Sequence, residues 1–342
     1  MPASLVVQTS FLGDVVLTTP LIAELAKRGP VDVIATPNRA SALANNPCIR
    51  AIIKYDKRQT YGAALHLWRT AQRIRSLRPY DAVYLAQGSF RSAVLALLTG
   101  ARERIGFATS GGRALYTRRV EYRGDRHHSE RLWWLAMSGC ADAPEPDQLR
   151  VRLYPSDEDR SAVDSMLREA GLLGGEFIVL APGSAWGTKR WPYFTDLAER
   201  LGARHNMVIV GSGADCDIAA AIMARVPNSL SVDACGKLPI LASAELIGRA
   251  RALVSNDSAP EHLASAMGTP TLVLYGPTVP EFGFGPLAPK HVVAGVAGLS
   301  CRPCDRHGPM RCPLGHWRCM RELSVEEVEA MLDSLLDEPV AA

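Results

Sequence analysis

The chain has 342 residues, of which 47% are hydrophobic, 21% charged and only 6% aromatic, and its formal net charge is +3. At roughly 100 to 200 residues per domain, this length predicts two domains. No stretch approaches the roughly 18 uninterrupted apolar residues of a membrane span, and no basic segment precedes an apolar run at the N-terminus, so we expect neither a membrane-spanning nor a secreted protein.

Positive and negative residues are divided unevenly along the chain. Residues 1–154 hold 22 lysines and arginines against 12 aspartates and glutamates, a net charge of +10, whereas residues 155–342 hold 16 against 23, a net charge of −7. The first half is therefore expected to attract an anion or an anionic surface. Arginines also solvate ordinary helices, so a binding role and a solvating role both stay open for one dense group: Arg113, Arg118, Arg119, Arg123, Arg126 and Arg131.

In the first half, strand and helix patterns alternate in the way that predicts βαβ units and a parallel sheet. Strands are predicted at 5–7, 31–34, 51–53, 82–85 and 104–107, with helices over 61–77 and 89–98. Pro20 fits the first turn of a further helix, where its missing amide costs nothing.

The segment 140–159 is rich in proline and acidic residues and predicts the boundary between a domain of residues 1–154 and one of residues 155–342. Beyond it, predicted strands at 177–180, 207–210, 252–254 and 271–274 alternate with helices near 193–204, 215–225, 241–250 and 258–267. Ser324 and Glu327 form a capping-box pattern that predicts a last helix. The expected fold class is α/β, with two doubly wound domains facing a cleft in which ligands bind at the strand ends.

Asp14 follows the first predicted strand, in the stretch QTSFLGDVVL. Gly13 permits a tight turn there, and Asp14 then opens a helix at the edge where open α/β sheets bind ligands. An acid in this place can also simply cap the helix and favour its dipole, so this structural role stays open. The fingerprint G-x-G-x-x-G is absent, which argues against an NAD enzyme.

The stretch APGSAWGTKRWPYF, residues 181–194, follows another predicted strand. Ser184 and Thr188 offer hydroxyls and Lys189 a positive charge, a composition that suits a phosphate or diphosphate. The spacing is not that of a Walker A loop, and an ordinary turn with packed tryptophans is the alternative.

A third stretch, SNDSAPEHL, places Asp257 directly before a predicted helix. Ser258, Ala259 and His262 lie on its first turn, where free backbone amides can hold an anion. Alternatively, Asp257 only caps the helix and His262 is a packing residue.

Read in order, the GD near the N-terminus, WGTKRWP, NDSAPEHLA, GTP and YGPT resemble glycosyltransferase family 9, the heptosyltransferases of lipopolysaccharide core assembly, and most closely the heptosyltransferase II branch. This resemblance implies the GT-B fold with two Rossmann-like domains, an ADP-heptose donor, inversion of the anomeric centre, and neither cofactor nor catalytic metal. The implied acceptor is the Kdo/heptose inner core of lipopolysaccharide, an anionic glycolipid. We therefore expect a cytoplasmic enzyme with peripheral contact at the inner membrane leaflet and no nucleic-acid partner.

The resemblance also implies roles for individual residues. Asp14 matches the general base on the acceptor hydroxyl, Lys189 the lysine at the donor diphosphate, and Asp257 the acid that holds the donor sugar. Further donor-binding positions are Ser184, Thr188, Ser258, Ala259 and His262, in the C-terminal domain. Acceptor-binding positions are Ser10, Gly13, Arg91 and Arg104, in the N-terminal domain. Ala259 stands where the family often has glycine, and Glu261 where methionine is common.

Residues 301–319, CRPCDRHGPMRCPLGHWRC, contain four cysteines in the spacing C-x2-C-x7-C-x6-C: Cys301, Cys304, Cys312 and Cys319. With His307 and His316 they could bind a structural zinc in a reducing compartment. The second half-site is not C-x2-C, so a loop of packed thiols is the alternative.

Two other functions stay open. The same fold can transfer another nucleotide-activated sugar, since nothing in the sequence alone reads the heptose or the base. A non-catalytic sugar-binding protein is the other, although the combination of Asp14, Lys189 and Asp257 argues against a passive binder. A dehydrogenase or epimerase would need the glycine fingerprint or a Tyr-x-x-x-Lys pair, and the sequence has neither.

Overall fold

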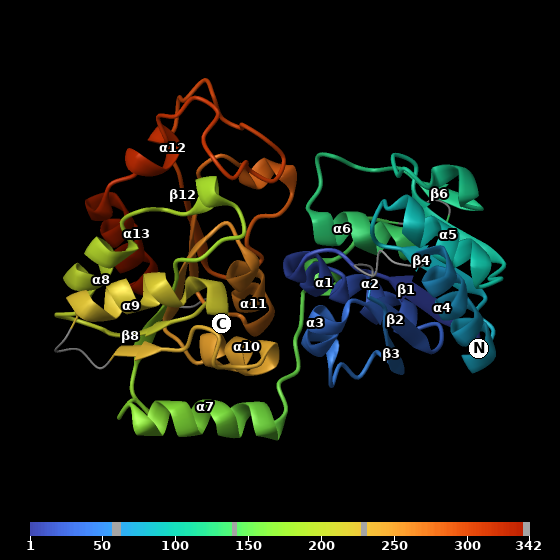
Figure 1. Cartoon of the computed structure of the whole chain (residues 1–342), viewed down its shortest axis with the longest axis horizontal. Helices are drawn as coiled ribbons and strands as arrows, with labels where there is room; N and C mark the ends of the chain where they lie inside the picture. Colours follow the sequence, from blue (N-terminus) through green and yellow to red (C-terminus); the bar gives the residue numbers. More distant parts are fainter. Residues whose placement is uncertain (57–62, 139–141, 227–230, 338–342) are drawn as a thin grey trace. The chain divides into compact units, whose positions relative to one another are not determined.

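The computed structural model describes residues 1–56, 63–138, 142–226 and 231–337 (Figure 1). The chain divides into two compact units, Met1–Tyr154 and Pro155–Ala342, so that the division falls within the proline-rich segment 140–159. Each unit is an α/β domain built on its own parallel sheet.

The sheet of the N-terminal unit has six parallel strands in the order β3-β2-β1-β4-β5-β6. The strands are β1 (Ser4–Val7), β2 (Val31–Ala35), β3 (Ala51–Lys54), β4 (Ala82–Leu85), β5 (Glu103–Phe107) and β6 (Arg118–Val120). The helices are α1 (Leu12–Leu17), α2 (Thr19–Ala26), α3 (Pro37–Ala40), α4 (Ala63–Leu77), α5 (Phe90–Leu98) and α6 (His128–Trp133). This strand order is that of the doubly wound nucleotide-binding fold.

The strands of this unit are apolar because helices cover both faces of the sheet. On one face, Leu5, Val7 and Val83 are fully buried against Leu67 and Ile74 of α4 and against neighbouring side chains of α5. Successive side chains of a strand point to opposite faces. Val6 and Val33 are also fully buried, so the second face is covered as well.

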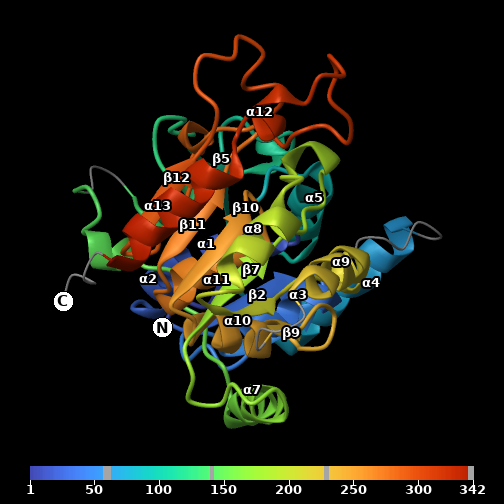
Figure 2. The ribbon, with the colours of Figure 1, turned by 90° about the vertical axis from the view of Figure 1, so that its left-hand side faces the viewer.

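The C-terminal unit repeats the same topology, with six parallel strands in the order β12-β11-β10-β7-β8-β9 (Figure 2). The strands are β7 (Phe177–Ala181), β8 (Asn206–Ile209), β9 (Ser231–Asp233), β10 (Ala252–Asn256), β11 (Thr271–Leu274) and β12 (His291–Ala294). The helices are α7 (Asp157–Glu169), α8 (Phe194–Leu201), α9 (Cys216–Arg225), α10 (Ile240–Gly248), α11 (Ala259–Met267), α12 (Arg318–Arg321) and α13 (Val325–Asp337).

The last helix, α13, begins where the sequence predicts it. The hydroxyl of Ser324 accepts a hydrogen bond from the amide of Glu327, and the Glu327 carboxylate accepts one from the Ser324 amide. The hydrogen bonds that the Ser324 amide and hydroxyl donate to the carboxylate hold the pKa of Glu327 below its ordinary value. Val328 and Leu332 then pack into the core of the unit.

In both sheets the strand order reverses between two central strands, which are β1 and β4 in the first sheet and β7 and β10 in the second. Ligands of open α/β sheets bind beyond the carboxyl ends of the strands at this switch point. The loops that follow β1 and β4, and those that follow β7 and β10, are therefore the places to look for a site.

Candidate active site

Asp14 lies in the first turn of α1, directly beyond the switch point of the N-terminal sheet. Its Oδ2 accepts a hydrogen bond from the Phe11 amide at 3.1 Å, which anchors the carboxylate at the helix start. The side chain stays 17% exposed, so its other oxygen can reach a ligand. The capping role and a catalytic role are thus compatible, because each uses a different carboxylate oxygen.

The second oxygen of Asp14 faces a histidine. Nε2 of His128, at the start of α6, lies 3.6 Å from Oδ1 of Asp14. Only 10% of the His128 side chain is exposed, so packing fixes the ring beside the carboxylate. His128 is not among the residues predicted from the sequence, since more than a hundred residues separate it from Asp14 along the chain.

A polar network supports the loop between β1 and α1. The Gln8 side-chain amide donates to the Thr18 hydroxyl at 3.0 Å, and its Oε1 accepts from the Ser10 amide at 3.1 Å. Ser10 is half-buried in this loop. The tight turn expected at Gly13 is wrong: Gly13 is the second residue of α1, because the helix already begins after Phe11.

Several arginines of the N-terminal unit donate to backbone carbonyls. Arg131 is buried and donates to the carbonyls of Arg123 and Gly124 at 2.7 and 2.5 Å. Arg104 donates to Leu115 and Ala101 at 2.8 and 3.0 Å.

Other arginines of this unit have contacts of the same kind. Arg118 donates to Leu135 at 2.8 Å, and the guanidinium of Arg123 lies 4.1 Å from the Trp134 ring centre. Arg91 is exposed and lies beside Tyr55, where its charge opposes the rise in the pKa of Tyr55 that burial causes. The structure thus gives much of the dense arginine group a role in joining loops, and acceptor contacts by Arg91 and Arg104 stay predictions.

In the C-terminal unit, Lys189 and Asp257 form a buried ion pair. The Lys189 Nζ lies 2.5 Å from Asp257 Oδ2, and each side chain is only 10% exposed. The hydroxyl of Thr278 donates to the same carboxylate oxygen. Loops from three strands therefore converge on Asp257, since Lys189 follows β7, Asp257 follows β10 and Thr278 follows β11.

Asn256 locks the first two of these loops together. Its side-chain amide donates to the Pro182 carbonyl at 2.8 Å, and its oxygen accepts from the Trp191 amide at 3.0 Å. Pro182 and Trp191 enclose the loop that carries Ser184, Thr188 and Lys189. Asn256 itself is fully buried, so it acts as a clamp on the loop rather than as a ligand-binding group.

The loop residues themselves are also fixed. Ser184 is buried, and its carbonyl accepts a hydrogen bond from the Arg190 guanidinium at 2.8 Å. Thr188 donates through its hydroxyl to the carbonyl of Pro309 at 2.5 Å. Gly308 has φ of +84°, and a Cβ there would lie 3.2 Å from the Thr188 hydroxyl, so glycine allows the 308–310 segment to cover this loop.

Helix α11 begins directly after Asp257, with Ser258 as its N-cap residue. The Ser258 side chain makes no capping hydrogen bond, and Pro260 occupies the first turn. The first amides of the helix and its positive dipole end therefore face the position that Asp257 and Lys189 border. His262, expected at this helix start, is buried, whereas Ala259, the first residue of the helix, is half-buried.

Glu261 lies on the same first turn of α11, and no role is predicted for it from the sequence. It is fully buried, and its Oε1 lies 3.3 Å from His262 Nε2. Burial, with the nearby negative charge of Asp257 added to it, raises the pKa of Glu261 well above its ordinary value, while Lys189 opposes the shift. Burial therefore favours the neutral carboxylic acid over the carboxylate beside the ion pair.

The cysteine-rich segment packs over the same loops. Cys301 Sγ lies 3.9 Å from His316 Nε2, and the Cys304 amide donates to the Pro277 carbonyl at 2.9 Å. Within the described ranges, no three histidine, cysteine or acidic side chains are grouped so as to hold a metal ion. The contacts that the structure does show are those of a cover over the loops of Lys189 and Thr278.

Comparison with known proteins places this arrangement in context. The family model described as glycosyltransferase family 9 (heptosyltransferase) matches residues 67–316. The chain is 30% identical over 321 residues to lipopolysaccharide heptosyltransferase 1 of Pseudomonas aeruginosa, covering 88% of this chain and 85% of that protein. It is 27% identical over 300 residues to lipopolysaccharide heptosyltransferase 2 of Escherichia coli, covering 81% and 84%.

Solved structures agree in fold. A family 9 glycosyl transferase from Veillonella parvula superposes with a TM-score of 0.83 at 22% identity, over 98% of this chain and 97% of that one. The ADP-heptose lipopolysaccharide heptosyltransferase II of E. coli gives a TM-score of 0.79 at 23% identity, over 98% of both chains. The two Rossmann-like units are thus those of the GT-B fold.

Proposed function

Because the chain belongs to glycosyltransferase family 9, the heptosyltransferases, we propose that it transfers heptose from ADP-heptose to the Kdo/heptose inner core of lipopolysaccharide. Its curated relatives include lipopolysaccharide heptosyltransferases of types 1, 2 and 3, which supports this substrate class. The observation that carries the proposal is the convergence of a lysine, an acid and a helix N-terminus at the switch point of the C-terminal sheet.

In this proposal the C-terminal unit binds the donor. The diphosphate lies against the first amides of α11 and the ammonium of Lys189, which keeps two further N–H donors after its bond to Asp257. Asp257 holds the ammonium in place and offers its remaining oxygen to the donor sugar. Ser184, Thr188, Ser258, Ala259 and His262 shape the surrounding pocket.

The N-terminal unit binds the acceptor and supplies the base, with Ser10, Gly13, Arg91 and Arg104 as further acceptor contacts. Asp14 removes the proton from the acceptor hydroxyl as its oxygen bonds to C1 of the heptose, while the bond from C1 to the diphosphate oxygen breaks and ADP leaves. The configuration at C1 inverts in this single displacement. Positioned general-base catalysis of this type contributes roughly a hundredfold or more to the rate.

The departing ADP carries the developing negative charge, and this charge needs stabilisation. Lys189 and the amide dipoles at the start of α11 supply it from fixed positions, which is the most effective electrostatic arrangement. We therefore propose that transfer needs neither a cofactor nor a metal ion. We further propose that the enzyme works in the cytoplasm, at the inner leaflet where its anionic acceptor lies.

The test is transfer of heptose from ADP-heptose to Kdo-lipid A that already carries one heptose, in EDTA, followed by mass spectrometry and NMR of the product. One added heptose with inverted anomeric configuration supports the proposal. Kdo-lipid A without heptose is tested as acceptor in parallel, since the chain matches heptosyltransferases of both type 1 and type 2. Transfer only from a different nucleotide sugar overturns the proposed donor. Absence of transfer in EDTA, with recovery when magnesium is added, overturns the metal-free part of the proposal.

A further inference from the structure

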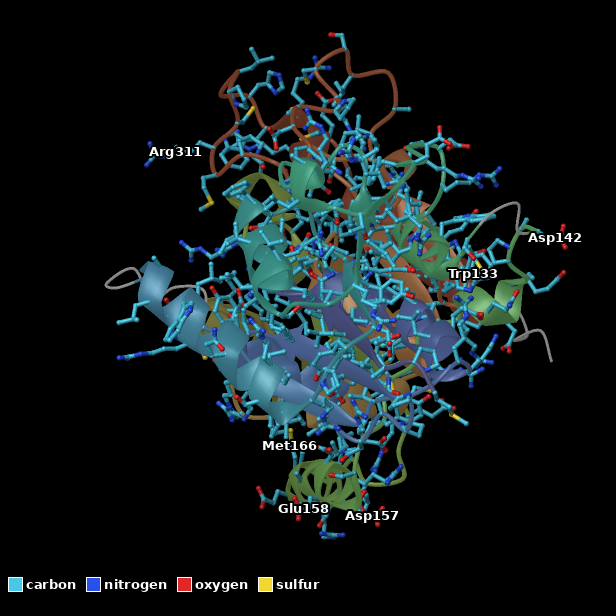
Figure 3. All side chains as sticks on the ribbon, turned by 90° about the vertical axis from the view of Figure 1, so that its right-hand side faces the viewer. Trp133, Asp142, Asp157, Glu158, Met166 and Arg311 are labelled. Atoms are coloured by element: carbon cyan, nitrogen blue, oxygen red, sulfur yellow. The ribbon has the colours of Figure 1, made fainter. Side chains whose placement is uncertain are left out.

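Helices α4 and α5 lie side by side on one face of the N-terminal sheet, as Figures 1 and 3 show. Their inward residues build one buried core with the strands. Arg75 of α4 lies beside Gly100, the second residue after α5, and the outward sides of these two neighbouring helices form one surface. We call this surface the α4–α5 face.

The α4–α5 face exposes large apolar side chains at helical spacing. Leu65 and Trp68 of α4 are 49% and 50% exposed, and Phe90 and Leu97 of α5 are 62% and 43% exposed. Phe90 and Leu97 are seven residues apart and so lie on the same side of their helix. Scattered single apolar residues are normal on a protein surface, but four on two adjacent helices mark an interaction site.

The same face is strongly basic. Arg69, Arg73 and Arg75 are exposed on α4, and no ion pair neutralises them within the described parts of the chain. Residues 63–100 contain only one acid, Asp81, whose carboxylate accepts a hydrogen bond from the Ala3 amide at 2.8 Å at the start of β4. The face therefore carries positive charge among its apolar residues without compensating carboxylates.

We propose that the α4–α5 face docks this enzyme on an anionic lipid bilayer. Basic residues attract anionic headgroups, and tryptophan with leucine and phenylalanine inserts into the headgroup boundary, which is the pattern of a surface-bound amphipathic element. No described helix is long and apolar enough to cross a bilayer, so the contact is peripheral. A second copy of the chain fits less well, because a two-fold contact would oppose the arginines of both copies.

The inference rests on the proposed function in one respect, the membrane glycolipid as acceptor. Its test measures vesicle binding and needs neither the sugar donor nor sugar transfer. The full chain is sedimented with vesicles of phosphatidylglycerol and phosphatidylethanolamine, and with neutral phosphatidylcholine vesicles. We expect binding to the anionic vesicles that weakens with salt. We expect Arg69→Glu/Arg73→Glu to weaken it at least about tenfold, and Trp68→Ser/Leu97→Ser by a similar factor.

A matched control is Arg168→Glu/Leu173→Ser, since both residues are exposed in the C-terminal unit. Heptose transfer to a deacylated, water-soluble acceptor and thermal unfolding verify that the variants are folded. Absence of vesicle binding by the wild type, or equal binding by the face variants and the control, overturns the inference while leaving the transferase assignment intact. Failure of transfer to the soluble acceptor, with vesicle binding retained, overturns the proposed function instead.

Discussion

The ammonium of Lys189 lies 2.5 Å from Oδ2 of Asp257, although 68 residues separate them in sequence. Thr278 donates a second contact to the same carboxylate oxygen. The pair thereby ties together the loops that follow β7, β10 and β11. In the proposed reaction it also fixes the cation beside the leaving diphosphate, so one contact serves both stability and catalysis.

Removing one partner of this buried pair should destabilise the C-terminal unit strongly. Lys189→Met leaves the Asp257 charge without its cation, and we expect the free energy of unfolding to fall by about 3 to 5 kcal/mol. The double variant Lys189→Met/Asp257→Asn should recover most of that loss and remain inactive. Urea unfolding measures the free energy of unfolding of both variants. The control is Lys237→Met, which removes the cation of the exposed pair with Asp233 and should change the free energy of unfolding by less than about 1 kcal/mol. Equal stability of the single variant and the control would contradict the account.

Thr278 should matter through its hydroxyl alone. Thr278→Val keeps the size of the side chain but removes the hydrogen bond to Asp257, so the free energy of unfolding should fall by about 1 to 2 kcal/mol. Donor binding should weaken too, because the carboxylate is held by one contact fewer. Calorimetry with ADP-heptose checks this, and Thr278→Ser should restore both quantities. If Ser and Val behave alike, the hydroxyl is not the cause.

The raised pKa of Glu261 predicts a pH-dependent stability. Above the ordinary carboxyl pKa, the unfolded chain loses this proton while the folded chain keeps it, so stability falls with rising pH by at most about 1.4 kcal/mol per pH unit. Glu261→Gln mimics the neutral acid and removes this slope. The variant should therefore equal the wild type below the ordinary carboxyl pKa and become more stable than it as the pH rises above that value. Parallel pH profiles of the two unfolding free energies would show that Glu261 is ionised in the folded protein.

His128 should position Asp14 rather than bind donor. We expect His128→Gln to lower kcat by about tenfold, as expected for a weakened general base, while the affinity for ADP-heptose stays unchanged. The neighbouring His127 caps α6 by accepting from the Ser129 amide, so His127→Asn, which retains a cap, is the matched control. Steady-state kinetics with both variants decide the point, and equal kcat values in the two would remove His128 from the mechanism.

Much of the fold could be predicted from the sequence because parallel strands buried on both faces are continuous apolar runs. The strands β6, β9 and β12 were missed, since Arg118–Val120 and Ser231–Asp233 are short and carry polar residues, and β12 lies at the sheet edge with partly exposed side chains. Helix boundaries were predicted closely for α11, whose N-terminal signal is strong. Residues 61 and 62 of one predicted helix lie outside the described residues.

The sequence predicts the members of the candidate site but not their pairings. Asp14, Lys189 and Asp257 could be selected because each follows a strand at the edge where ligands bind. The contacts of Asp257 with Thr278 and of Asp14 with His128 join residues far apart in sequence, and only the folded chain brings them together. For the dense arginine group the sequence left a binding role and a solvating role open, and the structure shows that Arg131 and Arg118 donate to backbone carbonyls.

The most direct test of the proposed reaction compares the wild type with Asp14→Asn at saturating ADP-heptose and acceptor. Asparagine keeps the size of the side chain and can still accept the Phe11 amide, but it cannot take a proton. We predict a fall in kcat of at least about a hundredfold with unchanged donor affinity, and wild-type activity for the exposed control Asp125→Asn. An Asp14→Asn enzyme that turns over within a few-fold of the wild type would contradict the assignment of Asp14 as the base.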